Sequence, residues 1–391
     1  MTEGKKVQTS RPALVLSEDQ ELLAKTTADF VAKKSPIRRV RELRDSGDPD
    51  GFSRALWKEM AELGWVGIPF PEEVGGADMG LSELAVVLEA LGRQLAPEPF
   101  LSTVLLGGQA LLLGGSDGQK AEWLPKLTAG EVLLALAYQE KGSRYDAHCV
   151  TSRAVADGDG WKLAGEKIQV LEGGSADAIV VAARTSGGDT DPEGISLFLV
   201  TPDTPGVTLT RQHRIDSRGA AIVALADVAV GAGALVGTLD GGGAILDRVL
   251  RLATVGLCAE MLGSMSEVFD RTLQYLKDRV QFGVPIGSFQ ALKHRAAELF
   301  IQIELSRSAV MAAARAEDAG ADDAPLLVSV AKARCSDAGI LVAHESIQMH
   351  GGIGMTDEHD MGFYLKRART AEFTFGDASW HRERWATLSG Y

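Results

Sequence analysis

The sequence has few cysteines, and their number and spacing exclude two kinds of structural support. Its 391 residues include three cysteines, Cys149, Cys258 and Cys335, which are far apart and odd in number. No Cys-x-x-Cys pair and no cysteine–histidine cluster has the spacing of a metal site. We therefore expect reduced thiols and no metal, as is usual for a cytoplasmic protein.

Long hydrophobic runs and basic clusters are also missing. No apolar run approaches the roughly 18 residues that span a bilayer, and the first 12 residues have no apolar segment like that of a secretion signal. The formal net charge is −13 and the basic residues are scattered, whereas nucleic-acid binding requires a basic footprint. We expect a soluble cytoplasmic protein that binds neither nucleic acid nor a membrane.

Hydrophobic patterns divide the chain into three parts, which together predict an α+β multidomain protein. Residues 1–135 are predicted to form a helical domain, whose first helix has Ser17 as N-cap and Gln20 at the capping-box position. Residues 136–240 contain short β-branched runs between Gly, Asp and Pro clusters, which predict a small barrel or sandwich. Residues 241–391 contain long helical patterns that need partners along their length, so a bundle is expected.

A junction between two of these long helices gathers side chains suited to a phosphate-bearing aromatic ligand. In the segment DRVQFGVPIGSFQALKHR, Arg279 and Phe282 have the spacing of one helical turn, and Phe289 and Gln290 open the second helix. An arginine binds phosphate, rings stack and an amide reads a polar edge. The alternative is an ordinary helix-turn-helix with a surface arginine.

The boundaries of these two helices are also suggested by the sequence. Gly283 and Pro285 are expected to end the first helix, and Ser288 to cap the second.

A glycine-rich segment ends the next long helix. In SIQMHGGIGMT, Gly351, Gly352 and Gly354 free the backbone to approach a dinucleotide phosphate closely. The alternative is a glycine C-cap. The segment is not a Rossmann fingerprint, because no strand precedes it.

The segment FTFGDASW, residues 373–380, contains one carboxylate, Asp377, among mostly apolar residues. Apolar surroundings raise the pKa of a carboxyl group toward values useful in proton transfer. Asp377 is therefore either a candidate catalytic base or a polar residue that begins a turn and the last helix.

Together these segments resemble the acyl-CoA dehydrogenase family. The stretches ELGWVGIPFPEEVGGADMG, RVQFGVPIGSFQALKHR and QMHGGIGMT match the family in the same order. The resemblance implies an N-terminal helical domain, a middle β-barrel and a C-terminal four-helix bundle, usually in a dimer of dimers. It also implies FAD, and the α,β-dehydrogenation of an acyl-CoA thioester in which a carboxylate removes the α-proton and a hydride passes to the flavin.

By this resemblance the ADP-binding half of the FAD site is intact. In the family these bundle residues hold the ADP end of the FAD whose flavin lies in a neighbouring subunit. The residues expected to bind the cofactor are Arg279, Phe282, Phe289, Gln290, Gln348, Gly351 and Gly352.

The flavin-binding half departs from the family pattern. In QEKGSRYD, Gln139 replaces a flavin-contacting threonine, Arg144 a glycine and Tyr145 a serine. Gln169 stands where a tryptophan covers the flavin, and Leu171 replaces a threonine that hydrogen-bonds near N5. Leucine offers no hydrogen bond, so a buried polar flavin edge would be left unpaired, at a cost of about 1–3 kcal/mol.

The usual base is missing as well. The resemblance places the family's usual glutamate on Gly376 and its alternative near Ala253, neither of which is a carboxylate. Asp377 is shorter than glutamate and offset by one residue, which favours a turn or cap role, or a polar contact to a ligand, over that of the base. Glu260, on the long helix, is expected to be paired or solvated.

These departures favour a base-less subunit of a heteromeric α2β2 dehydrogenase, similar to the small subunit of pimeloyl-CoA dehydrogenase and to the dehydrogenases of steroid side-chain degradation. A second acyl-CoA dehydrogenase-like subunit would supply the flavin cradle and the catalytic glutamate, and electron-transfer flavoprotein would accept the electrons. The alternatives are a self-sufficient homotetramer with Asp377 as base, and a non-catalytic scaffold. The acyl substrate stays open.

Overall fold

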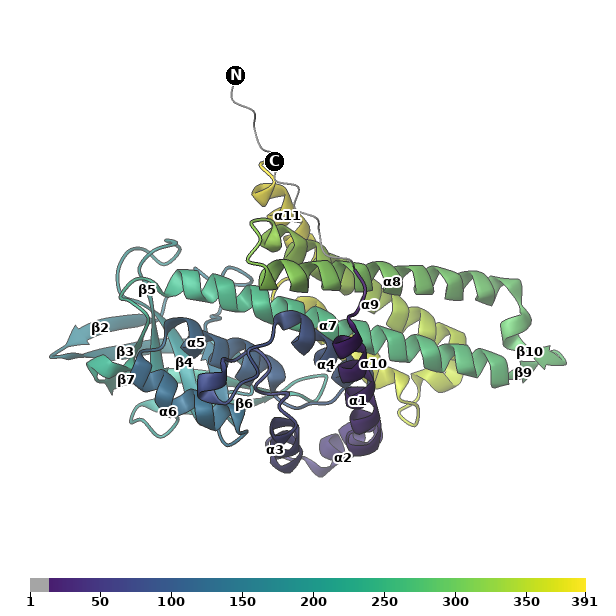
Figure 1. Ribbon diagram of the computed structural model, residues 1–391, viewed down its shortest axis with the longest axis horizontal. Helices are drawn as coiled ribbons and strands as arrows, with labels where there is room; N and C mark the ends of the chain where they lie inside the picture. Colours follow the sequence, from purple (N-terminus) through teal and green to yellow (C-terminus); the bar gives the residue numbers. More distant parts are fainter. Residues whose placement is uncertain (1–13) are drawn as a thin grey trace, which may run out of the picture.

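The computed structural model describes residues 14–391, so the N-terminal stretch considered above as a secretion signal lies outside the described residues. The chain forms a helical part, a sheet and a helical bundle in that order (Figure 1). The first part contains α1 (Glu18–Lys34), α2 (Arg38–Ser46), α3 (Arg54–Glu62), η1 (Glu72–Val74), α4 (Leu81–Arg93), η2 (Phe100–Gly108), α5 (Gln109–Gly114) and α6 (Asp117–Thr128).

The predicted start of the first helix is confirmed. The Ser17 hydroxyl accepts a hydrogen bond from the Gln20 backbone N–H at 3.2 Å, and the Gln20 side-chain oxygen accepts one from the Ser17 N–H at 3.1 Å. This reciprocal pair satisfies two N–H groups that a helix otherwise leaves free at its beginning.

The middle part is a mixed sheet in which the strands follow the order β6-β7-β3-β2-β4-β5-β8, with β1 paired to β4. Its strands are β1 (Leu134–Ala137), β2 (Arg153–Asp157), β3 (Gly160–Leu171), β4 (Ala178–Arg184), β5 (Ile195–Val200), β6 (Val207–His213), β7 (Gly219–Val230) and β8 (Leu235–Val236). The predicted three-part fold is confirmed, and the middle sheet is not closed into a barrel, because the end strands β6 and β8 do not pair. With only two residues, β8 offers too few backbone groups to continue the ladder.

The C-terminal part is a bundle of four helices, three of them long, with a fifth, α11, packed on α9. They are α7 (Gly242–Asp278), α8 (Gln290–Asp318), α9 (Ala324–His350), α10 (Met361–Phe373) and α11 (Ala378–Leu388). Helix α7 is 37 residues long. It runs from the sheet at one end of the molecule to a small hairpin, β9 (Val280–Gln281) and β10 (Val284–Pro285), at the other (Figure 1).

Close helix packing joins the first part to the bundle. An added Cβ at Gly263 on α7 would lie 1.9 Å from the Glu89 carbonyl oxygen of α4, and one at Gly92 would lie 2.1 Å from the Glu260 carbonyl oxygen. Only glycine permits such an approach of two backbones. The crossing fixes α4 against the centre of α7. Over residues 14–391, no helix is both long enough and apolar enough to cross a membrane.

Candidate functional site

The junction after α7 differs from the predicted one. The helix ends at Asp278, before Arg279 and Phe282, so their expected helical spacing is wrong. Two positive-φ residues, Phe282 (φ 56°) and Gly283 (φ 79°), form a two-residue turn between β9 and β10. Such turns match the twist of paired strands, and the β-branched residues on either side favour pairing.

The expected cap of the second helix is also wrong. Ser288 lies in the short turn η4 (Ile286–Ser288), and α8 begins after Phe289 without a side-chain cap. The backbone holds this region instead: the Arg279 N–H donates to Tyr275 O, and the Ile286 N–H donates to Arg279 O, each at 2.8 Å. Arg279 is thus fixed by its main chain while its side chain stays exposed.

All seven residues predicted to bind the ADP part of FAD are exposed. Phe282, at the tip of the hairpin, has 91% of its surface exposed, and its ring meets that of Phe289 edge-on with centroids 6.1 Å apart. Exposed aromatic rings beside an arginine form an open surface that another molecule can cover.

The glycine-rich segment lies at the same end of the bundle. Tyr275, one turn before the end of α7, stacks on His350, the last residue of α9, with ring centroids 4.4 Å apart. Gly351 is the C-cap of α9 at φ 64°, as the simpler alternative predicted. Gly352 has no such conformation, and an added Cβ there would meet nothing within 4 Å. Packing within the chain therefore does not explain a glycine at 352.

Asp377 lies at the start of α11 and caps it. One carboxylate oxygen accepts from the Trp380 N–H at 2.9 Å, and the other accepts from the Tyr145 hydroxyl at 3.2 Å. Burial would raise the pKa of Asp377, but these hydrogen bonds outweigh it and lower the pKa below its usual value. The raised pKa expected of a base in apolar surroundings is therefore wrong. The cap hypothesis for Asp377 is confirmed in the structure.

Two buried residues that the sequence did not single out support this turn. Lys332 on α9 donates to the carbonyl oxygens of Glu372 at 3.0 Å and Gly376 at 2.7 Å, and burial lowers its pKa to about 8. His381 on α11 contacts Phe375 O through Nε2 at 3.0 Å, and burial with the nearby lysine lowers its pKa to about 3. Both residues hold the backbone of the turn, and no local motif marks them.

The residues that depart from the family pattern lie where the sheet meets the bundle, a region we call the sheet–bundle junction. The Gln139 amide donates to Arg144 O at 2.8 Å, and Arg144 has φ 51°, which is uncommon for a side chain of its size. The Tyr145 ring meets Trp380 edge-on at 5.9 Å. The Tyr145 side chain is therefore held by its contacts with the beginning of α11. Gln169 is exposed in an irregular part of β3, at φ 52°, and Leu171 borders a cavity of about 20 Å³.

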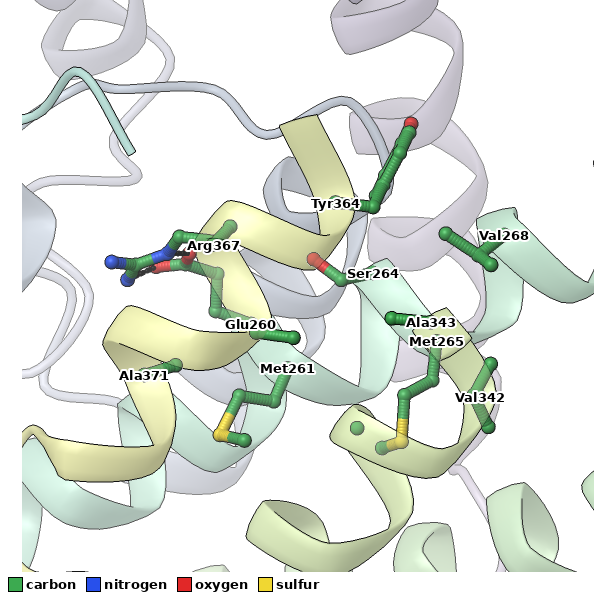
Figure 2. A pocket seen from close by; sticks show the side chains of 12 residues that line it. Glu260, Met261, Ser264, Met265, Val268, Val342, Ala343, Tyr364, Arg367 and Ala371 are labelled. Atoms are coloured by element: carbon green, nitrogen blue, oxygen red, sulfur yellow. Dashed lines mark hydrogen bonds and ion pairs between the residues drawn. The ribbon is translucent and has the colours of Figure 1, made fainter. Parts of the chain in front are cut away.

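Glu260 is paired, as expected, and belongs to a buried group of charges at this junction. Its carboxylate accepts from Arg218 at 2.8 and 3.1 Å and from Arg367 at 2.7 and 3.1 Å. Burial would raise the pKa of Glu260, but the two guanidinium groups outweigh it and lower the pKa. Figure 2 shows Arg367 and Glu260 side by side at one end of an apolar pocket that Met261 and Met265 also line.

Comparison with known sequences assigns most of the chain to one family. The family described as "Acyl-CoA dehydrogenase, N-terminal domain" matches residues 17–131, the corresponding middle domain matches 135–226, and the C-terminal domain matches 240–387. The chain therefore belongs to the acyl-CoA dehydrogenase family, whose cofactor is FAD.

Individual relatives are similar over nearly the full length. Probable acyl-CoA dehydrogenase YngJ of Bacillus subtilis is 30% identical, over 94% of this chain and 97% of that protein. Among solved structures, a variant of the Tcur3481-Tcur3483 steroid ACAD is 31% identical with a TM-score of 0.85, over 95% of this chain and 98% of that one. The ChsE4-ChsE5 complex from Mycobacterium tuberculosis is 29% identical with a TM-score of 0.87, over 97% and 100%.

The two groups of residues fit FAD differently. At the hairpin end of the bundle, an arginine, two aromatic rings and the open backbone at Gly352 fit a dinucleotide phosphate and its base. At the sheet–bundle junction, Leu171 offers no hydrogen bond to a polar flavin edge, and the cavity it borders has a volume of about 20 Å³. The exposed groups at the hairpin end therefore fit the ADP part of FAD.

Proposed function

We propose that the chain is one of two unlike subunits of an α2β2 FAD-dependent acyl-CoA dehydrogenase. It donates the ADP-binding half of the FAD site, and its partner supplies the flavin cradle and the catalytic glutamate. This proposal depends mainly on Asp377, the one carboxylate in residues 373–380. Its two oxygens already accept hydrogen bonds, one as the cap of α11 and one from the Tyr145 hydroxyl. A carboxylate held ionised by two hydrogen-bond donors is a weak base and is not free to approach a substrate.

The bundle residues have defined tasks in this proposal. Arg279 neutralises the pyrophosphate, Phe282 and Phe289 cover the adenosine end, and Gln290 and Gln348 offer amide hydrogen bonds to its polar edge. Gly351 and Gly352 let the phosphates approach the main chain. All seven predicted ADP-binding residues are exposed, so a cofactor bound mainly by another subunit can contact them.

FAD supplies the hydride acceptor, and electron-transfer flavoprotein is the expected next carrier of the electrons. The acyl-CoA is bound and deprotonated by the partner. Two similar solved structures, the Tcur3481-Tcur3483 steroid ACAD and the ChsE4-ChsE5 complex, are each described by the names of two proteins. This supports a heteromeric assembly for the present chain. The first of these also favours a steroid-derived acyl group over a dicarboxylate for this chain.

The test is purification of the chain alone and together with an acyl-CoA dehydrogenase-like partner that carries the glutamate. We expect no flavin and no oxidation of a steroid side-chain CoA thioester or of pimeloyl-CoA by the lone chain, and both in the complex. Flavin and activity in the lone chain would establish the homotetramer instead.

Arg279→Ala in the complex separates a cofactor-binding role from a scaffold. A charged hydrogen bond contributes about 1.5–3 kcal/mol, so flavin affinity should fall about ten- to a hundredfold. The control is Arg153→Ala on β2, which removes a similarly exposed arginine far from the hairpin. Unchanged flavin content in Arg279→Ala would contradict the proposal.

A further inference from the structure

A pocket on the bundle lies between α8, α9 and α11, and we call it the α11 pocket. It has a volume of about 310 Å³, whereas sites for small molecules typically enclose about 300–1,000 Å³. The residues that α9 contributes run from Ser329 to Asp337. Asp337 comes 11 residues before Gln348, which is about 16 Å along the helix. The α11 pocket is therefore separate from the expected ADP-binding surface at the hairpin end.

Three side chains that line the α11 pocket each have a buried polar atom with no hydrogen-bond partner among residues 14–391. These atoms are Ser329 Oγ, Arg334 Nε and His381 Nδ1. Ser329 and His381 are themselves buried, with 0% and 1% of their surface exposed. Native folds rarely leave a buried polar atom unpaired, because it costs about as much as a lost hydrogen bond. Three such atoms around one pocket indicate a ligand that bonds to them.

The chemistry of these atoms determines which groups the ligand must have. His381 Nε2 lies 3.0 Å from Phe375 O, which can only accept, so Nε2 carries the ring proton. Burial and the nearby Lys332 lower the pKa of His381 to about 3, so the ring is neutral at pH 7 and Nδ1 is an acceptor. The ligand therefore needs a hydroxyl or N–H group. Arg334 Nε and the Ser329 hydroxyl both carry a hydrogen, so the ligand also needs an acceptor.

The charges around the pocket favour an anion as that acceptor. Arg382 forms an ion pair with Asp337, so these two charges of the pocket cancel. Arg334 donates through Nη2 to the neutral Gln302 side chain at 2.7 Å, and no carboxylate in the described part of the chain pairs with it. This hydrogen bond fixes the guanidinium and leaves its Nε–H for a ligand. A carboxylate forms a stronger hydrogen bond with a guanidinium than a neutral acceptor does.

We propose that the α11 pocket is a binding site for a small hydroxy monocarboxylate, whose carboxylate accepts from Arg334 and Ser329 and whose hydroxyl donates to His381. The apolar side chains of Val330 and Trp385 also line the pocket and suit a short carbon chain. They are 41% and 40% exposed, which leaves the pocket open to an entering molecule. This site goes beyond the proposed function and does not depend on it, because FAD and acyl-CoA are bound elsewhere.

The test is an NMR titration of small acids with the purified complex and with the lone chain. Lactate, 3-hydroxybutyrate and 4-hydroxybutyrate place the hydroxyl at three distances from the carboxylate, and propionate and butyrate are their counterparts without it. In both samples, at least one hydroxy acid should bind about two- to tenfold more tightly than its counterpart, which is the effect of one hydrogen bond.

Two results would overturn the inference. One is equal affinity within every pair of acids, or no binding of any of them. The other is binding by the lone chain but not by the complex, which would mean that the partner subunit fills the pocket. Flavin content, measured in the same complex, tests the proposed function separately.

Two variants locate the bound acid. Ser329→Ala removes a donor to the carboxylate, and Arg334→Lys keeps the charge but removes the Nε–H, so each should weaken binding about ten- to a hundredfold. Without ligand, Ser329→Ala should melt at or above the wild-type temperature, because it removes an unpaired buried hydroxyl. The control is Ser308→Ala, whose exposed hydroxyl on α8 bonds to Glu304 O. Unchanged affinity in both Ser329→Ala and Arg334→Lys would place the acid elsewhere and refute the inference.

Discussion

Replacement of Asp377 by asparagine and by alanine separates a helix cap from a catalytic base. Asparagine can still accept from the Trp380 N–H through Oδ1, and its Nδ2 can then donate to the Tyr145 hydroxyl oxygen; the corresponding distances to Asp377 are 2.9 and 3.2 Å. Asparagine and aspartate are about equal as N-caps, whereas alanine costs about 1 kcal/mol. Losing the half-buried hydrogen bond from Tyr145 adds about 1 kcal/mol.

The expected result is therefore a difference of about 2 kcal/mol in the free energy of unfolding between Asp377→Ala and the wild type, with Asp377→Asn within about 0.5 kcal/mol of the wild type. Urea denaturation of the complex, followed by circular dichroism, measures both. Activity of the complex should stay within about twofold in Asp377→Asn, because a cap does not transfer protons.

A catalytic base gives the opposite pattern. Removing a general base lowers the rate by about 10²–10⁴-fold, and asparagine cannot accept the proton at all. A loss of that size in Asp377→Asn, at wild-type stability, would refute the cap interpretation and with it the assignment of catalysis to a partner. Asp377→Glu provides a check on geometry, since a longer side chain disturbs the cap but would partly preserve a base.

Three further outcomes follow from the structure. Gly263→Ala places a Cβ 1.9 Å from the Glu89 carbonyl oxygen and should destabilise the chain by about 2–3 kcal/mol. In Gly339→Ala the new Cβ meets nothing closer than Met261 Cε at 3.4 Å, so this variant should be more stable than the wild type by about 0.5–1 kcal/mol. Equal urea midpoints for the two variants would contradict this. Ser17→Ala removes the cap of α1 and should cost about 1 kcal/mol, with Ser379→Ala, exposed inside α11, as the neutral control. The pKa of His381 is lowered to about 3 by burial, so its contribution to stability is complete above pH 6.5 and declines as pH falls toward 3. His381→Gln should flatten the urea midpoint between pH 6.5 and 4.5, and an equally steep profile would show that another group titrates.

Regular elements were predictable because their signals are local. The capping box at Ser17 and the β-branched run at 178–184 each depend on neighbours in sequence, and both became the expected element. The glycine end of α9 was local in the same way.

The prediction of the junction after α7 failed because two local signals in the sequence favoured different structures. Arg279 and Phe282 have the spacing of a helical turn. However, Phe282 and Gly283 form the turn of a tight hairpin between Gln281 and Val284, and the helix therefore ends early. The sequence could not show that the sheet stays open, because closure into a barrel depends on the length of the end strand β8.

The buried charges around Glu260 could not be predicted from the sequence. Asp216, Glu260 and Arg367 are separated by more than forty residues at each step, and each alone resembles an ordinary surface charge. Only the folded arrangement makes them partners. The predicted role of Glu260 as a paired residue was confirmed, but nothing in its neighbourhood named Arg218 or Arg367.

The length of α7 has a consequence for how the two ends of this chain can change over time. Glu260 and Arg279 are 19 residues apart, which along a helix is roughly 28 Å. A rigid rod of that length separates the charges at one end from the hairpin at the other, so substitutions at one end need not disturb the other. Residues at one end can therefore lose their catalytic function by drift while those at the other end stay under selection. Gene duplication followed by such a loss in one copy is a direct route from a tetramer of four identical chains to an α2β2 tetramer.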